Sequence, residues 1–129
     1  MSFSLHFTID AESDRNVMNV KIYDVWKKQT AVDYHQEFKS EAEPLMGRKW
    51  AKIINVTNWK ATYPDAMSIL GKHMRWSQQN GNVLAIYITD KPISKNNLKK
   101  MFHIGGTGKI SRFARSREDA EKLLRDFGF

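Results

Sequence analysis

Two kinds of hydrophobic pattern predict strands in this chain. Residues 3–9 and 17–25 place apolar side chains at alternate positions, which is typical of half-buried strands. A short polar stretch, residues 10–16, separates them, so we expect an antiparallel pair. Residues 50–56 and 83–88 are almost continuously apolar. These two runs predict central strands, and the second should be covered on both faces of the sheet.

Helical periodicity fills the gaps between the predicted strands. We expect Thr30 to cap a first helix that reaches the mid-40s, where Pro44 should end or kink it. We interpret Thr62 as the cap of a second helix, with Asp65 three residues later as its capping partner. Asn80-Gly81 should end that helix, because glycine is favoured just beyond a helix C-terminus.

Two more helices are predicted in the last third. Ser94 is expected to cap a short third helix, which a glycine-rich turn and a short strand over residues 109–114 should follow. Ser116 and Asp119 form a capping box for a last helix that runs to Phe127. The predicted order of elements is therefore β-β-α-β-α-β-α-β-α.

This order predicts one α/β domain that spans residues 1–129. Strands that alternate with helices form parallel sheets with right-handed crossovers, while the opening hairpin adds an antiparallel pair. We therefore expect a mixed, mainly parallel sheet of about five strands with about four helices.

The chain resembles the STAS-like domains, in their SpoIIAA-like branch, over nearly its whole length. The resemblance rests on the paired opening strands, on the passage from residues 53–59 into 64–67, on the apolar run 83–88 and on the closing helix 116–127. It implies a STAS-like fold and a non-enzymatic regulatory module. Such domains, which include anti-sigma-factor antagonists, bind a partner protein or a small ligand at the loop and helix start after the central strand.

At one point the chain departs from the pattern of those antagonists. The family's antagonists are switched by phosphorylation of a serine in an Asp-Ser-Ser-Gly-type turn at that helix start. Here the same place holds Thr62-Tyr63-Pro64-Asp65, without serine or glycine. Thr62 is the nearest hydroxyl, whereas Ser68 falls inside the predicted helix.

The segment after the central strand also supplies the candidate binding residues. Ligands of open α/β sheets bind beyond the carboxyl ends of the parallel strands, where we expect residues 58–63 to form a loop. We predict a ligand or partner site made of Asn58, Trp59, Thr62, Tyr63 and Asp65. The alternative interpretation is that the Trp59 ring folds back to cover the sheet edge.

The net charge of +7 is concentrated near the C-terminus. Residues 1–90 carry 11 Lys and Arg against 10 Asp and Glu, while residues 91–129 carry 10 against 4. A basic segment attracts anions, although it also serves simply to keep a surface solvated. The residues that we predict for anion binding are Lys95, Lys99, Lys100, Lys109 and Arg112. Binding of nucleic acid, or of another anionic surface, is the alternative function, although no nucleic-acid motif accompanies the charge.

Several chemistries find no support in the sequence. There is no cysteine, and the motif at residues 105–109 lacks the first glycine and the hydroxyl residue of a phosphate-binding loop. The four histidines show no metal-ligand spacing. Four carboxylates lie on the outer face of the first predicted helix, without the shielding that acid–base catalysis needs: Asp33, Glu37, Glu41 and Glu43. We therefore predict no catalytic residue, no metal and no cofactor, and a small enzyme is the weakest hypothesis.

The remaining expectations concern partners and location. We expect a protein partner or a small apolar or anionic ligand, with a homodimer as an open alternative. No stretch approaches the roughly 20 apolar residues that span a bilayer, and no signal peptide is evident at the N-terminus. The absence of cysteine fits the cytosol, so a cytoplasmic protein is the expectation.

Overall fold

The computed structural model describes residues 2–129, and their side chains from residue 4 onward. One six-stranded sheet forms its centre, and the strands lie side by side in chain order. They are β1 (Ser2–Phe3), β2 (Phe7–Glu12), β3 (Val17–Trp26), β4 (Trp50–Thr62), β5 (Asn82–Ile88) and β6 (Ser111–Ala114). The pairs from β1 to β3 are antiparallel and those from β3 to β6 are parallel, which confirms the predicted mixed, mainly parallel sheet.

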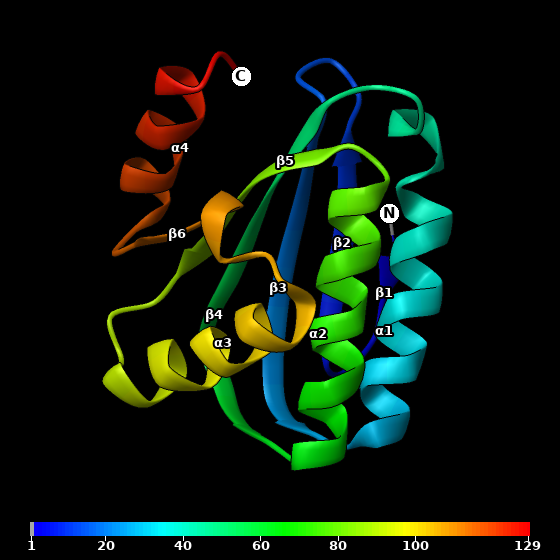
Figure 1. The fold of residues 1–129 in the computed structure, drawn as a ribbon, viewed down its shortest axis with the longest axis vertical. Helices are drawn as coiled ribbons and strands as arrows, with labels where there is room; N and C mark the ends of the chain where they lie inside the picture. The colour runs from blue at the N-terminus through cyan, green and yellow to red at the C-terminus, as the bar shows by residue number, and fades with distance from the viewer. Residues whose placement is uncertain (1) are drawn as a thin grey trace.

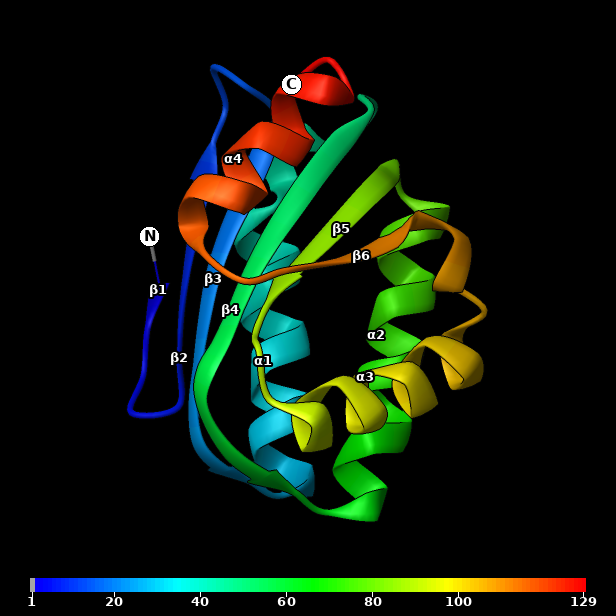
Figure 2. The same cartoon turned by 90° about the vertical axis from the view of Figure 1, so that its left-hand side faces the viewer.

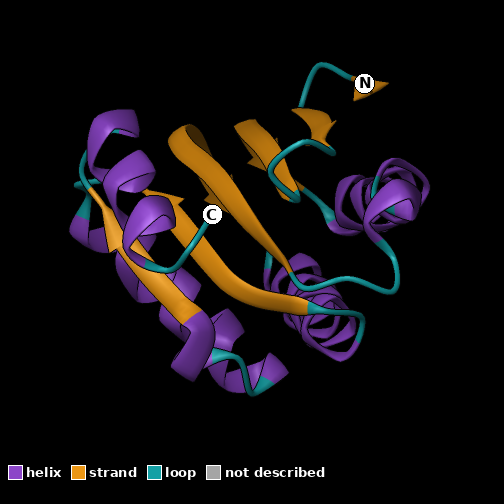
Figure 3. Cartoon of the chain, turned by 90° about the horizontal axis from the view of Figure 1, so that it is seen from above, coloured by secondary structure: helices purple, strands orange, loops and turns teal. Residues whose placement is uncertain are grey.

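Helices cover both faces of this sheet. They are α1 (Lys28–Glu41), α2 (Pro64–Gln79), α3 (Pro92–Gly105) and α4 (Arg117–Asp126), with short 3-10 turns at η1 (Glu43–Leu45) and η2 (Gly108–Ile110). The first three helices lie on one face, where α1 and α2 run side by side, and α4 lies on the other (Figures 1 and 2). The strands twist strongly between these layers when the molecule is seen from above (Figure 3). In the described part of the chain, no helix combines the length and apolar character needed to cross a membrane.

Two hydrophobic cores result from these layers. The larger core fills the space between the sheet and α1, α2 and α3, whereas the smaller core lies beneath α4. Residues of β5 alternate between the two: Leu84 and Ile86 belong to the core under α4, and Ala85 and Tyr87 to the larger core. This alternation follows from the period of two in a strand, and it confirms that β5 is buried on both faces.

The prediction of one continuous strand over residues 3–9 is wrong. The stretch from residue 3 to residue 9 is divided into β1 and β2 by a turn at Ser4, Leu5 and His6. The hydroxyl of Ser4 accepts hydrogen bonds from the backbone N–H groups of His6 and Phe7, at 2.9 and 3.1 Å. A serine side chain that satisfies two nearby N–H groups stabilises a turn in place of a continuous strand.

Two predicted helix starts are also wrong. The first helix begins at Lys28, and Thr30 lies in its first turn, where its hydroxyl accepts a 3.4 Å hydrogen bond from the Lys27 N–H. The third helix begins at Pro92, two residues before Ser94. Proline is well suited to the first turn of a helix, because it has no N–H that would need a partner there. In the last helix, by contrast, Ser116 caps the N-terminus as predicted, accepting from the Asp119 N–H at 3.1 Å.

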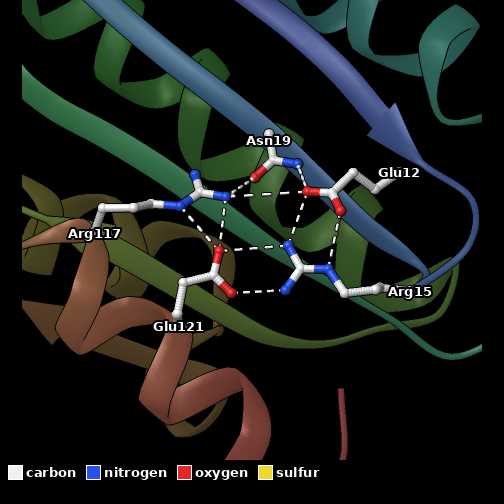
Figure 4. Close-up of polar contacts among 5 residues, drawn as sticks. All are labelled: Glu12, Arg15, Asn19, Arg117 and Glu121. Carbon is white, nitrogen blue, oxygen red and sulfur yellow. Dashed lines mark hydrogen bonds and ion pairs between the residues drawn. The ribbon is translucent and has the colours of Figure 1, made fainter.

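A polar network fastens α4 to the hairpin of β2 and β3 (Figure 4). Arg15, in the hairpin turn, pairs with Glu12 at 2.9 Å and with Glu121 of α4 at 2.6 Å. Arg117 donates to Asn19 of β3 at 2.8 Å and pairs with Glu121 at 2.9 Å. Hydrogen bonding to Arg15 is the main reason that the pKa values of Glu12 and Glu121 lie below the usual value of 4.5. The last helix is therefore positioned by paired charges as well as by its apolar face.

Candidate functional site

The segment predicted as a loop, residues 58–63, is the end of a strand. β4 continues to Thr62, and it pairs with β3 as far as the contact between Trp26 and Thr62. The pairing passes two register irregularities, and Asp24 of β3 adopts a left-handed backbone conformation with φ of 59°. Polar and apolar side chains alternate over residues 58–62, and this alternation is a signal for a strand. The two consecutive polar residues Thr57 and Asn58 interrupt the pattern and make the signal hard to recognise.

Trp59 points into the larger core. Only 7% of its surface is exposed, and its ring packs edge-on against Trp26 with ring centroids 5.7 Å apart. The indole N–H finds no hydrogen-bond acceptor among the described residues. Trp59 thus covers the sheet instead of offering its ring at the surface, and Tyr63 is the one exposed aromatic residue of the predicted site.

The start of α2 is built differently from the capping box that the sequence suggested. The residue at the N-cap position is Tyr63, so the prediction of Thr62 as the cap is wrong. The backbone N–H of Tyr63 donates to the Trp26 carbonyl at 3.0 Å, which attaches the helix start to the end of β3. Pro64 occupies the first helical position, and Asp65 accepts a hydrogen bond from the Ala66 N–H at 2.9 Å. A carboxylate in this turn also interacts favourably with the helix dipole.

Exposed hydrophobic side chains gather at this end of the sheet. Among side chains from residue 4 onward, six large hydrophobic ones are exposed. Four belong to this end, where Leu5 is 86% exposed, Ile93 75%, Tyr63 50% and Val25 37%. They come from the β1–β2 turn, the end of β3 and the starts of α2 and α3, which all lie toward the lower end of Figure 2. We call these four residues the sheet-end rim.

Shallow grooves connect the rim with the predicted polar residues. Leu5 and Asn58 line the same open groove of about 590 Å³, and Ile93 lies with Thr62 at a much smaller one. Lys60 is paired with Asp24 at 3.2 Å across the strand ends. Thr62, Tyr63 and Asp65 lie together at the start of α2, whereas Asn58 lies earlier in the extended strand and lines a different groove. Leu5, Val25 and Ile93 were missed. No local pattern identifies them, because they come from segments far apart in the chain.

Part of the predicted anion-binding set meets at a second surface, between α3 and β6. Lys99 of α3 and Lys109 of η2 line a groove of about 840 Å³, together with Phe102, His103 and Phe113. Lys95 lies over the ring of Phe113, with its Nζ atom 5.8 Å from the ring centroid. We call this surface the basic groove. The glycine-rich turn borders it, with Gly106 in the left-handed conformation that ends α3.

Besides Lys95, which lies over the Phe113 ring, two predicted anion-binding residues do not line the basic groove. Lys100 is exposed on α3 but does not line the groove. The Arg112 guanidinium donates to the carbonyls of Lys109 and Ser111, at 2.8 and 2.9 Å, and lies 5.6 Å from the centroid of the Phe127 ring. Arg112 thus interacts mainly with its own neighbours.

A buried lysine lies beneath α2 and was not singled out in the sequence. Lys52 of β4 is only 2% exposed, its amine donates to the Ser77 hydroxyl at 3.3 Å, and it lies 5.5 Å from the Phe38 ring centroid. Burial lowers the pKa of Lys52 from 10.5 to about 7. The charge pattern gives one signal for it, because Lys52 interrupts an otherwise apolar run.

Two of the four histidines meet beside this lysine. The Nδ1 atoms of His35 in α1 and His73 in α2 lie 2.8 Å apart and share a hydrogen bond. One ring donates to this bond, and the ring that accepts is neutral. Burial, with Lys52 and His35 nearby, holds the pKa of His73 well below 6.5. Within residues 2–129, no group of three or more histidine and acidic side chains could hold a metal ion. This pair links α1 with α2, with His73 buried and His35 partly exposed.

Known structures share this arrangement, although no protein-family model and no curated protein matches the sequence. An uncharacterized protein of the DUF3478 family from Shewanella loihica, with a SpoIIAA-like fold, superposes with a TM-score of 0.68. The two sequences are 12% identical, and the match covers 96% of this chain and 98% of the other. The Bacillus cell fate determinant SpoIIAA, in its phosphorylated form, gives a TM-score of 0.59 at 12% identity, over 91% and 98% of the chains. The chain is thus an α/β domain with the SpoIIAA-like, or STAS-like, fold.

Proposed function

We propose that this protein is a non-enzymatic regulatory module that binds a partner protein through the sheet-end rim. The observation that carries the proposal is the gathering of Leu5, Val25, Tyr63 and Ile93 at one end of the sheet. Exposed apolar surface concentrated at one end of a domain is a feature of interaction sites. Tyrosine at such a site contributes a large contact area with little loss of conformational freedom.

The position of the rim in the fold supports this proposal. It lies beyond the carboxyl ends of β3, β4 and β5, where open α/β sheets present their binding residues. The two structural relatives share the same layers, and the resemblance to anti-sigma-factor antagonists suggests this region for partner contact. Because Tyr63 and Pro64 stand where those antagonists carry a phosphorylated serine, we expect binding without that switch.

The charges beside the rim suggest the chemistry of the partner. Lys27, Lys28 and Lys91 are exposed at the same end, and the Lys91 amine donates to the Thr57 carbonyl at 2.9 Å. Asp65 and Asp90 are also exposed at this end, so a partner surface with an apolar centre and charges of both signs at its margin would match this arrangement. The similar structures give no support to nucleic acid as the partner.

The test compares a rim variant with a control that removes an exposed hydrophobic side chain elsewhere on the surface. The full chain, its Tyr63→Ser/Ile93→Ser variant and a Phe127→Ser control are immobilised, and proteins retained from host extract are identified by mass spectrometry. A purified candidate is then titrated into each by calorimetry. We expect the rim variant to bind at least about tenfold more weakly, and the control to bind like the original chain, because Phe127 lies outside the rim.

Two results would count against the proposal. One is a partner whose affinity is the same for the rim variant and the original chain. The other is self-association, measured by sedimentation, that the rim variant abolishes. This second result would identify the rim as a homodimer interface and not as the site for a different protein.

A further inference from the structure

The basic groove joins positive charge with an aromatic floor. Lys95, Lys99 and His103 follow one another at intervals of four residues, so they share one face of α3. Lys109 approaches from the other side, on η2. No Asp or Glu is among the residues that line the groove. Lys99 and Lys109 line the groove without a carboxylate to neutralise them, which gives the groove a positive potential that attracts an anion.

The floor of the groove adds a second kind of recognition. The rings of Phe102 and Phe113 lie 5.8 Å apart at an angle of 37°, and Phe102 packs in turn on Tyr87 at 5.1 Å. Phe113 is partly buried and Phe102 is only 7% exposed, so Phe113 provides most of the aromatic surface at the groove, with the flexible Lys95 side chain over its ring. A flat apolar group could pack there in offset or edge-on geometry, as aromatic pairs in proteins do.

We propose that the basic groove binds a small aromatic anion, in which a flat ring carries a phosphate or carboxylate group. The ring contacts Phe102 and Phe113, while the anionic group lies between Lys99 and Lys109. A volume of about 840 Å³ accommodates a ligand of this size, since small-molecule sites span roughly 300–1,000 Å³. The groove shares no lining residue with the sheet-end rim, so this inference stands independently of the proposed protein partner.

The experiment uses three probes that separate the two halves of the proposed ligand. The ¹⁵N-labelled full chain is titrated at low salt with phenyl phosphate, inorganic phosphate and benzyl alcohol. We expect phenyl phosphate to shift the amide signals of Gly106, Gly108 and Ser111, and to bind at least about tenfold more tightly than either of the other probes. Replacing phenyl phosphate by benzoate shows which anionic group the site prefers.

Charge and ring variants complete the test. Lys99→Glu/Lys109→Glu should weaken phenyl phosphate binding by about tenfold or more, because both lysines contact the anion. Lys21→Glu/Lys49→Glu, which makes the same charge change at exposed positions outside the groove, should leave it unchanged. Phe113→Leu keeps an apolar side chain but removes the ring, and it should reduce the affinity for phenyl phosphate towards that for inorganic phosphate.

The inference would be overturned by any of three results. These are the absence of phenyl phosphate shifts at the groove, equal binding of phenyl phosphate and inorganic phosphate, and equal loss in the groove and control charge variants. Because Tyr63→Ser/Ile93→Ser leaves the groove intact, that variant should still bind phenyl phosphate. Failure of the rim proposal and failure of this one can therefore be told apart.

Discussion

At the scale of single residues, Lys52 is the most unusual feature of the molecule. It is the only charged side chain among the buried residues that the structure describes, and its nearest polar partner is a hydroxyl group. A hydroxyl compensates poorly for the loss of water around an ammonium group, so burial favours the neutral amine. The Lys52 Nζ atom also lies 5.5 Å from the centroid of the Phe38 ring, whose face attracts the amine when it carries a proton.

We predict that the free energy of unfolding rises between pH 7 and pH 9.5. The native pKa of Lys52 is about 7, below its usual 10.5, so in this range the unfolded chain binds a proton that the native chain has released. The stability gain is absent below pH 7, begins at the native pKa and is complete only above 10.5, where it would reach ~5 kcal/mol. Denaturant titrations at several pH values measure this rise. The range ends at pH 9.5 so that it stays below the ordinary tyrosine pKa of 10.0.

Lys52→Met is the matched variant for this prediction. It keeps an unbranched side chain, and it should be more stable than the original chain at pH 7 because no charge needs to be buried. It should also lose most of the rise with pH. A variant that is less stable at pH 7, with the pH dependence unchanged, would show that the amine stabilises the fold and titrates normally.

At the scale of elements, the attachment of α4 depends on the network around Arg15. We predict that Arg15→Ala speeds hydrogen exchange of the α4 amides and lowers the free energy of unfolding by about 1 kcal/mol. The effect is modest because Arg15 and Glu12 are each 33% exposed in their side chains. The pKa values of Glu12 and Glu121 are lowered, so this contribution is present at neutral pH and is lost as the pH falls below them.

An arginine of the same helix provides the control. Arg125 lies in the last turn of α4, exposed and outside the network. Arg125→Ala should leave exchange in the first turns of α4 nearly unchanged. If both variants change exchange equally, the network does not hold the helix, and the apolar face alone positions it.

At the scale of the whole molecule, the fold depends on helices that cover both faces of the sheet. Leu124 of α4 is fully buried in the smaller core, whereas Leu123 is only partly buried. We predict that Leu124→Ala lowers the free energy of unfolding by about 2–4 kcal/mol, with a clearly smaller loss for Leu123→Ala. Chemical denaturation of the two variants measures this difference. Equal losses would mean that α4 packs through a different face.

Element order and fold class could be predicted without coordinates, while several boundaries could not. The alternation of Leu84, Ala85, Ile86 and Tyr87 between two cores required only a continuously apolar run flanked by helices. The division of the first strand and the length of β4 could not be predicted in this way. Ser4 and residues 58–62 are locally compatible with more than one conformation. Hydrogen bonding to neighbouring segments, such as that of β4 to the end of β3, selects one of them.

The sequence by itself therefore determined the strands, the helices and their parallel arrangement, since these depend on the period of apolar side chains and on local turn chemistry. It also located Tyr63 and the lysines of α3 as candidates for binding. Only the tertiary structure turned Trp59 inward, placed Leu5 and Ile93 at the same end as Tyr63 and set Lys109 opposite Lys99. Those relations join segments that are distant in the chain, and no local period records which distant side chains will meet when the sheet and its two helical layers pack together.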